Sequence, residues 1–376
     1  MGALLALVVA FVVVASLVTV PYYAIVPGDA IGVDRLITVP SQQRHPVHGR
    51  VLLTDVGVNT LKLIQWIPAR LGLEPNTDLV PKTLLTGGLP VKEFDEQGIV
   101  DMAESQLSAE AVALRQLGYS VPEHDVGVTL YIIIPGSAAW VSGLQVGDVV
   151  TAIDHTPTPN PDALVAAVRA HHPGDVIAVQ VGSIAHPLPG HTVRVRLRSA
   201  TQNGQTVPVL GIPRSTSPDQ PRGMGTQPVY DFPFPVSINS DQIGGPSAGL
   251  AFTLGIINSL AGGDITGGRV VAATGTIRPD GTVGDVGGVK QKTIAVEQAG
   301  ATVFFVPPSP DGAHAELKLA QQVANGNLKV FEVGSLSDAM AQLGRLGGVL
   351  GRAQAGPPPG PGGHSTPYGW PTAPWS

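Results

Sequence analysis

The sequence contains no cysteine, and charged and aromatic side chains make up only 13% and 5% of its 376 residues. A chain without cysteine forms no disulfides, which is compatible with an exported protein but does not require one. The net charge is −6, so the chain has no excess of basic residues, and we exclude a nucleic-acid partner. Hydrophobic residues make up 43% of the chain, enough to build the cores of two or three domains.

The first 28 residues contain no charged side chain, and residues 3–20 read "ALLALVVAFVVVASLVTV". An apolar run of about 18–20 residues can cross a bilayer as a helix. A cleaved signal peptide has a basic start and a shorter apolar core, neither of which is found here. We therefore expect residues 1–28 to form an uncleaved, single-pass membrane anchor, with Tyr22 and Tyr23 at the interface. The rest of the chain is expected outside the cytoplasm; a cleaved, secreted form is the alternative.

Residues 29–123 are expected to form a membrane-proximal segment without visible chemistry. It contains a strand-like stretch over 49–56 and a helical apolar spacing from about 94 to 118. His45 and His48 form an H-x-x-H pair, but two histidines without further ligands predict no metal site.

Residues 124–212 have the pattern of a separate module, with short strands around one helix and Gly-Asp turns. The stretch "PGSAAWVSGLQVGDVVTAID" and the helix that begins near Asp162 resemble a PDZ domain of the kind associated with bacterial proteases. PDZ domains bind an extended peptide as an added strand beside a helix. The resemblance implies a peptide groove between residues 127–130 and the helix 162–170; a spacer without a ligand is the alternative.

Residues 213–350 begin with a Pro/Gly/Ser-rich connection, after which helical and strand-like segments alternate. Helices are expected over 247–262 and 288–300, and a strand over 269–277. This pattern predicts an α/β or α+β domain. Residues 351–376 are rich in proline and glycine and are expected to be disordered. The fold class is therefore α+β, with several domains.

Within residues 213–350, the octapeptide "IGGPSAGL" at 243–250 places a serine at the expected start of a helix. Proline is favoured in the first helical turn, so Ser247 should lie at or just inside the helix start. Free backbone N–H groups at such an end can stabilise an oxygen that becomes anionic. Because Pro246 has no N–H, the donors would be the N–H of Ser247 and that of a nearby residue. A helix cap without catalysis explains the same residues.

A catalytic serine also needs a base. The only histidine in residues 213–350 is His314, which has the pattern of a solvated helix start. Lys290 and Lys292, in "GDVGGVKQKT", are the other candidates, since a buried lysine can lose its charge. Two residues apart, they point to different faces of a helix, and periodicity does not choose between them.

The octapeptide, followed by "ATGTIRPDGTVGDVGGVKQKTIAVEQAGA", resembles the proteolytic domain of Lon proteases over about residues 229–345. The resemblance implies that Ser247 is the nucleophile. We assign the first lysine of the GG[LIV]KxK motif, Lys290, as its partner, with Thr274 near that lysine. Gly244 replaces an acidic residue found in many Lon proteins, and no GxxxxGK[ST] nucleotide motif occurs.

An anchor, a PDZ module and a Lon-type domain in this order resemble the YlbL-type Lon-like peptidases. The resemblance implies an ATP-independent, membrane-anchored serine endopeptidase that needs no cofactor or metal. Its partners would be unfolded or C-terminally exposed polypeptides and, by analogy, further copies of itself. A tethered PDZ scaffold that no longer cleaves peptides is the alternative.

Overall fold

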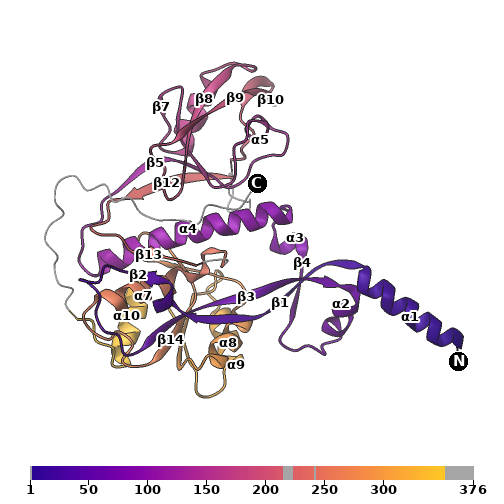
Figure 1. Ribbon diagram of the computed structural model, residues 1–376, viewed down its shortest axis with the longest axis vertical. Helices are drawn as coiled ribbons and strands as arrows, with labels where there is room; N and C mark the ends of the chain where they lie inside the picture. Colours follow the sequence, from indigo (N-terminus) through magenta and orange to yellow (C-terminus); the bar gives the residue numbers. More distant parts are fainter. Residues whose placement is uncertain (1, 215–222, 241–242, 352–376) are drawn as a thin grey trace. The chain divides into compact units, whose positions relative to one another are not determined.

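The computed structural model describes residues 2–214, 223–240 and 243–351, which form two compact units (Figure 1). The first unit combines Met1–Ile37, Gln43–Pro90 and Ser247–Ala353, and the second contains Thr38–Gln42 and Val91–Pro246. The chain thus leaves the first unit at Pro90 and re-enters it at Ser247. Most of the tail expected over residues 351–376 lies outside the described residues.

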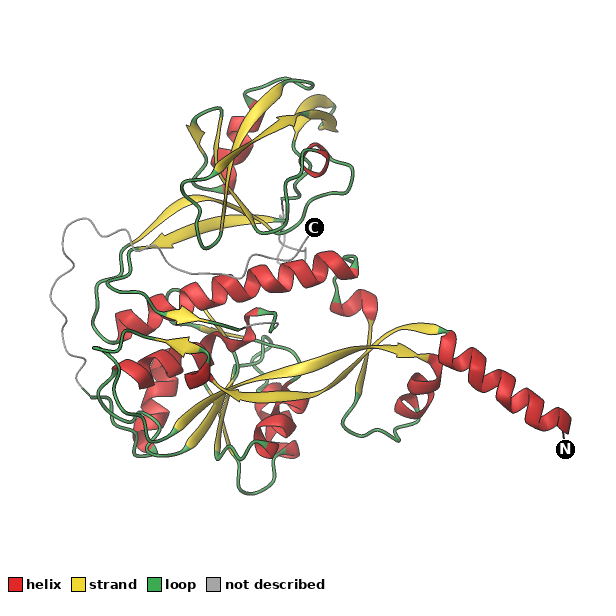
Figure 2. Ribbon diagram, viewed as in Figure 1, coloured by secondary structure: helices red, strands yellow, loops and turns green. Residues whose placement is uncertain are grey.

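The first unit is built on a six-stranded sheet with the order β18-β17-β14-β3-β1-β4. Its parallel part comprises β3 (Arg50–Lys62), β14 (Val270–Ala273), β17 (Val303–Val306) and β18 (Lys329–Glu332). Its antiparallel part joins β1 (Thr19–Gly32) to β3 on one side and to β4 (Asp78–Pro81) on the other. Figure 2 shows β1 and β3 as a long two-stranded arm.

This sheet corrects the expected separation of residues 29–123 from the carboxyl-terminal domain. Val51 of β3 lies in register with Val271 of β14, so the early strand is a central member of the later domain's sheet. The physical reason is visible in the burial: Leu52 and Leu53 point to opposite faces, and both are buried. A strand that is apolar on both faces must be covered on both, as in a parallel sheet between helices.

Four helices of the carboxyl-terminal segment belong to this unit: α7 (Gly249–Leu260), α8 (Val289–Gln298), α9 (Ala315–Val323) and α10 (Leu336–Arg345). The helices expected over 247–262 and 288–300 are therefore confirmed, with slightly shorter bounds. Side chains of α8 and α9 pack against one face of the sheet in a shared core. This core contains Leu52, Ala272, Val289, Val296, Phe304, Val306 and Ala320. Every residue of α7 is buried, and this helix contacts β3 and β14.

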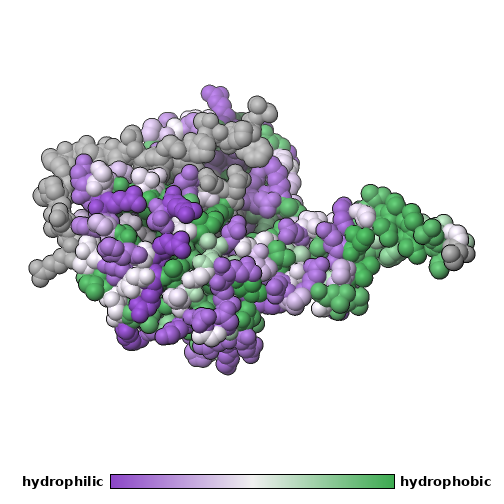
Figure 3. All heavy atoms as spheres, turned by 60° about the horizontal axis from the view of Figure 1, so that its bottom comes forward, coloured by the Kyte–Doolittle hydropathy of each residue, from purple (hydrophilic) through white to green (hydrophobic). Residues whose placement is uncertain are grey.

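The membrane anchor expected over residues 1–28 is helical only in its first part. Helix α1 (Gly2–Leu17) ends where β1 begins, because residues 19–32 pair with β3. Among the described residues, no helix is both long enough and apolar enough to cross a membrane. Figure 3 shows an apolar surface over α1, where large side chains such as Leu4, Leu7 and Phe11 are exposed. The arm also carries α2 (Leu63–Arg70), followed by α3 (Lys82–Leu85) after β4.

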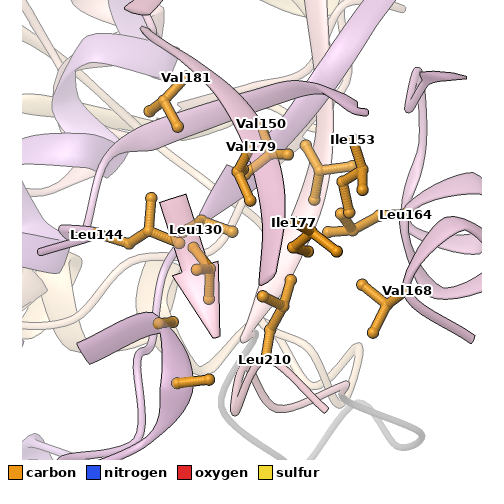
Figure 4. Close-up of a cluster of buried hydrophobic side chains, with 14 of the residues drawn as sticks. Leu130, Leu144, Val150, Ile153, Leu164, Val168, Ile177, Val179, Val181 and Leu210 are labelled. Carbon is orange, nitrogen blue, oxygen red and sulfur yellow. The ribbon is translucent and has the colours of Figure 1, made fainter. Parts of the chain in front are cut away.

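The second unit joins one long helix, α4 (Val91–Gln116), to a sheet with the order β12-β5-β6-β8-β9. The strands are β5 (Glu123–Leu130), β6 (Asp148–Ile153), β8 (Val176–Ser183), β9 (His191–Arg196) and β12 (Met224–Tyr230). Helix α6 (Pro161–Arg169) starts with Asn160, whose side chain accepts a hydrogen bond from the Ala163 N–H. Leu164 and Val168 of α6 face Ile177 and Leu130 of the sheet in a dry core (Figure 4).

The structure corrects the predicted peptide groove of this module. β5 pairs with β12 along one edge and with β6 along the other, so residues 127–130 have no free edge for a peptide. Within the described residues, the edge strand on that side is β12, which contacts α6. The module therefore extends beyond the expected boundary at residue 212, because β12 comes from the stretch assigned to the connection and the following domain.

Candidate active site

Ser247 lies in a short 3-10 turn, Pro246–Ala248, that leads directly into α7. The expectation that Pro246 opens the helix and places Ser247 at its start is thereby confirmed. The carbonyl of Ser247 accepts a hydrogen bond from the Gly275 N–H at 2.9 Å, and the Leu250 N–H donates to the Gly275 carbonyl at 3.1 Å. The backbone of the helix start is thus fixed to the segment that follows β14.

The glycines before Ser247 allow a bend that other residues would resist. Gly245 has a φ of 86°, in the left-handed region that favours glycine. Its N–H donates to the carbonyl of Gly98 on α4 at 2.7 Å. The N–H of Gly245 is therefore engaged and is not available to an incoming substrate carbonyl in this conformation.

Lys290 does not approach Thr274. Its amine donates to Asp78 Oδ1 at 2.7 Å, and the two side chains are 25% and 46% exposed. Partial burial, the largest single effect, would raise the pKa of Asp78, but hydrogen bonds from Lys290 and Gln291 and the charge of Lys290 together lower that pKa below its usual value. Lys290 is thus held as a charged partner of a carboxylate at the rim of the sheet.

Lys292 occupies the position that was expected for Lys290. Its side chain is buried, and its Nζ donates to Thr274 Oγ1 at 3.1 Å. Burial lowers the pKa of Lys292 to about 8, although the charges of Asp55 and Glu316 act in the opposite direction. The expectation that Thr274 lies near the lysine of the site is correct for Lys292 and wrong for Lys290. The reason is geometric: residue 292 faces the sheet, while residue 290 faces outward from the same helix turn.

Gly288 shapes the start of α8 so that this orientation is reached. It has a φ of 72°, and a Cβ at this position would lie 2.7 Å from Val56 Cγ1 on β3. The helix can therefore approach β3 closely only with glycine at this position. Gly288, the second glycine of the motif's GG pair, thus allows the close approach of α8 to β3 that accompanies the burial of Lys292.

Thr274 links the lysine to the serine. It is fully buried, and its hydroxyl both accepts from Lys292 Nζ and donates to the Ser247 carbonyl at 3.3 Å. Its own N–H is fixed by the Phe305 carbonyl at 3.0 Å. A buried lysine with a pKa of about 8, linked through Thr274 to the backbone of a serine at a helix start, is suited to accept a proton from a hydroxyl.

Two acidic residues near this lysine were missed by the sequence reasoning. Asp55 lies on β3, in the segment expected to carry no chemistry, and Glu316 lies on α9. Both favour the charged form of Lys292. The available signal was the pattern "RVLLTD", in which an aspartate directly follows the buried apolar residues of a strand.

Two segments of the chain match models of known protein families. Residues 240–343 match the model of the Lon protease (S16) C-terminal proteolytic domain, and residues 133–181 match a PDZ domain model. The first match contains Ser247, Thr274 and both lysines. The second contains β6, α6 and most of β8.

Comparison with curated proteins finds Lon proteases. The Lon protease of Mycoplasma genitalium is 46% identical over 63 residues, which is 17% of this chain and 8% of that protein. Lon protease 1 of Sorangium cellulosum is 29% identical over 102 residues, which is 27% of this chain and 12% of that protein. The chain thus spans only a small part of the length of these relatives.

Among solved structures, the PDZ domain of an SdrC-like protein from Listeria monocytogenes is similar at 19% identity. The similarity covers 23% of this chain and 84% of that domain, with a TM-score of 0.20. A score of this size supports no conclusion about the site.

Proposed function

We propose that this chain, which carries a Lon-type proteolytic domain and a PDZ domain, is a serine endopeptidase with Ser247 as nucleophile and Lys292 as general base. The observation that carries the proposal is the pair of contacts made by Thr274, to the amine of Lys292 and to the backbone of Ser247. The proposal replaces Lys290, which is paired with Asp78, by Lys292.

The reaction follows from these positions. Neutral Lys292 accepts the proton of the Ser247 hydroxyl as the oxygen attacks the carbonyl of a peptide bond. Backbone N–H groups at the start of α7 stabilise the oxyanion of the tetrahedral intermediate. Lys292, now charged, donates its proton to the leaving amine, and water hydrolyses the acyl-enzyme. Thr274 holds the amine toward the serine throughout.

The chain itself is proposed to cleave without hydrolysing ATP and without a metal. The chemistry of the site supports this proposal, because the proton transfers described above need only the amine of Lys292 and the hydroxyl of Ser247. The printed sequence also contains no GxxxxGK[ST] motif. Addition of ATP or of a chelator is therefore expected to leave the cleavage rate unchanged.

Polypeptides are the proposed substrates, and the PDZ domain is proposed to select them or to control their access. The edge strand β12 beside α6 supports this proposal, because PDZ domains bind peptides as an added strand beside a helix. The peptide would extend the sheet at β12, not at the stretch 127–130.

Attachment to a membrane is also proposed, with α1 as the element in contact with lipid. The support is the exposed apolar surface of α1, since an apolar helix without a protein cover gains free energy when it leaves water. We also predict that the catalytic domain lies outside the cytoplasm and that several copies of the chain assemble. Protease protection in spheroplasts tests the first, and analytical ultracentrifugation tests the second.

The test of the proposed function is the digestion of a denatured protein, such as reduced casein, by the full chain in detergent without ATP. The unaltered chain is expected to produce fragments, and Ser247→Ala is expected to produce none. A PDZ scaffold without activity would instead leave casein intact while binding peptides. Cleavage by Ser247→Ala at the rate of the unaltered chain would refute the proposal.

A further inference from the structure

Helix α4 runs alongside the segment that leads into Ser247 and is hydrogen-bonded to several of its described residues. The carboxylate of Glu110 accepts from the Val236 N–H at 3.2 Å, and the Gln106 amide donates to Ser240 Oγ at 2.9 Å. Further along, the Gly98 carbonyl accepts from the Gly245 N–H. The Ser105 hydroxyl donates to the Pro246 carbonyl at 3.0 Å. Val236, Ser240, Gly245 and Pro246 are therefore held to α4, and Pro246 directly precedes the serine.

The bond from Ser105 acts on the peptide unit that carries the N–H of Ser247. The carbonyl of Pro246 and the N–H of Ser247 belong to one planar peptide group, and in a trans peptide they point in opposite directions. A donor that holds the carbonyl therefore also fixes the direction of the N–H. Ser105 is only 5% exposed, so its hydroxyl has few competing partners in water.

Helix α4 is itself fixed to the PDZ domain. Val100 of α4 packs with Tyr131, Val149 and Ile184 in a small buried cluster. The hydroxyl of Tyr131 also donates to the Glu104 carboxylate on the same helix. The hydroxyl of Ser105 thus sits on a helix that cannot turn without breaking its contacts with the PDZ sheet.

We propose that Ser105 is a positioning residue that aims the N–H of Ser247 as a donor to the oxyanion. This inference rests on the proposed function, because it assigns a role within the same reaction. A donor fixed in advance stabilises the developing charge without reorganising during the reaction. When the Ser105 hydroxyl is removed, the Pro246–Ser247 peptide can rotate, and the N–H is aimed correctly for only part of the time.

The test compares Ser105→Ala with a matched control, Ser120→Ala, which removes an exposed hydroxyl just beyond the end of α4. Cleavage of a fluorogenic peptide is measured per active site, with the sites counted by a serine-directed fluorophosphonate. We expect kcat of Ser105→Ala to fall about threefold to tenfold, the effect of one lost hydrogen bond. KM and the pH dependence of the rate should be unchanged, and the control should behave as the unaltered chain.

A purely structural role for Ser105 would lower the thermal midpoint or the number of active sites, while kcat per site stays at its original value; this result overturns the inference. Ser105→Cys is the second variant, because a thiol has nearly the same size but donates weakly, and an intermediate kcat is expected. If Ser247→Ala cleaves the peptide as fast as the unaltered chain, the proposed function fails and this inference fails with it. If Ser247→Ala is inactive while Ser105→Ala keeps full kcat per site, only the inference fails.

Discussion

Lys292 Nζ and Thr274 Oγ1 lie 3.1 Å apart in the interior of the first unit, and among the residues that the structure describes no carboxylate forms an ion pair with this lysine. The threonine hydroxyl offers the amine a hydrogen-bond acceptor without a charge. A neutral partner satisfies the amine but does little to stabilise its protonated form, so burial dominates and the pKa falls. Lys290, two residues earlier, has the opposite environment, with Asp78 as a charged partner.

Substitution of the two lysines is expected to separate their roles. Lys292→Ala should abolish cleavage, and Lys292→Arg should do the same because a guanidinium does not lose its proton near neutral pH. Lys290→Ala should keep most of the activity and cost less than about 1 kcal/mol of stability, since its pair with Asp78 is partly exposed. Casein digestion and thermal unfolding measure the two effects. Equal loss of activity in Lys290→Ala and Lys292→Ala would contradict the assignment.

The rate of cleavage should depend on pH through the neutral fraction of Lys292. With a pKa of about 8, the neutral amine increases about tenfold per pH unit below pH 7 and reaches a plateau above about pH 9. The measurement is kcat/KM on a fluorogenic peptide from pH 5.5 to 10. A rate that is constant over this range would exclude a lysine base.

Thr274→Val keeps the size and branching of the side chain and removes its hydroxyl. Both of its contacts, to Lys292 and to the Ser247 carbonyl, would be lost, and we expect kcat to fall about tenfold or more. Thr302→Val is the matched control, because Thr302 makes an exposed contact with the Val270 carbonyl. A similar loss in both variants would indicate a general effect of valine on the sheet and not a role in the site.

Stability should also respond to the protonation of Lys292. The folded pKa of about 8 lies below the ordinary value of 10.5, so the unfolded chain binds more protons between these two pH values. Its contribution to the free energy of unfolding therefore rises from about pH 8 to about pH 10.5. Lys292→Met should remove this dependence and stabilise the protein below pH 8, by on the order of 2–3 kcal/mol. Urea unfolding at pH 7 and pH 10 measures both changes.

The amino-terminal strands should be required for the carboxyl-terminal domain to fold. A fragment of residues 229–350 lacks β1 and β3, which leaves one edge of β14 unpaired and Phe304 without the contacts of Leu52. We expect this fragment to be unfolded or aggregated by circular dichroism and light scattering. Deletion of residues 2–17 alone should leave the sheet and its activity intact. A soluble, cooperatively folded 229–350 fragment would contradict the prediction.

Much of the site could be predicted from local sequence, and the errors have a common origin. The position of Ser247 follows from Pro246 and a helix pattern, both of which are local signals. The choice between Lys290 and Lys292 depends on which side of α8 faces the sheet, and that is decided by partners more than 200 residues earlier, Asp78 and Val56. Two strand pairings that cross the expected domain boundaries were missed for the same reason, because neither the pairing of β3 with β14 nor that of β5 with β12 leaves a local pattern. Periodicity shows that a face is buried but not which segment covers it.

The division of one sheet between the two ends of the chain has a consequence for biosynthesis. A ribosome synthesises β1 and β3 early, yet β14, which pairs with β3, and the following β17 and β18 emerge only after residues 91–246 of the second unit have been made. The lysine, its threonine and the serine can therefore come together on the sheet only after the intervening second unit has been translated. If the proposed function holds, a nascent chain that lacks β14, β17 and β18 cannot cleave the newly made proteins around it.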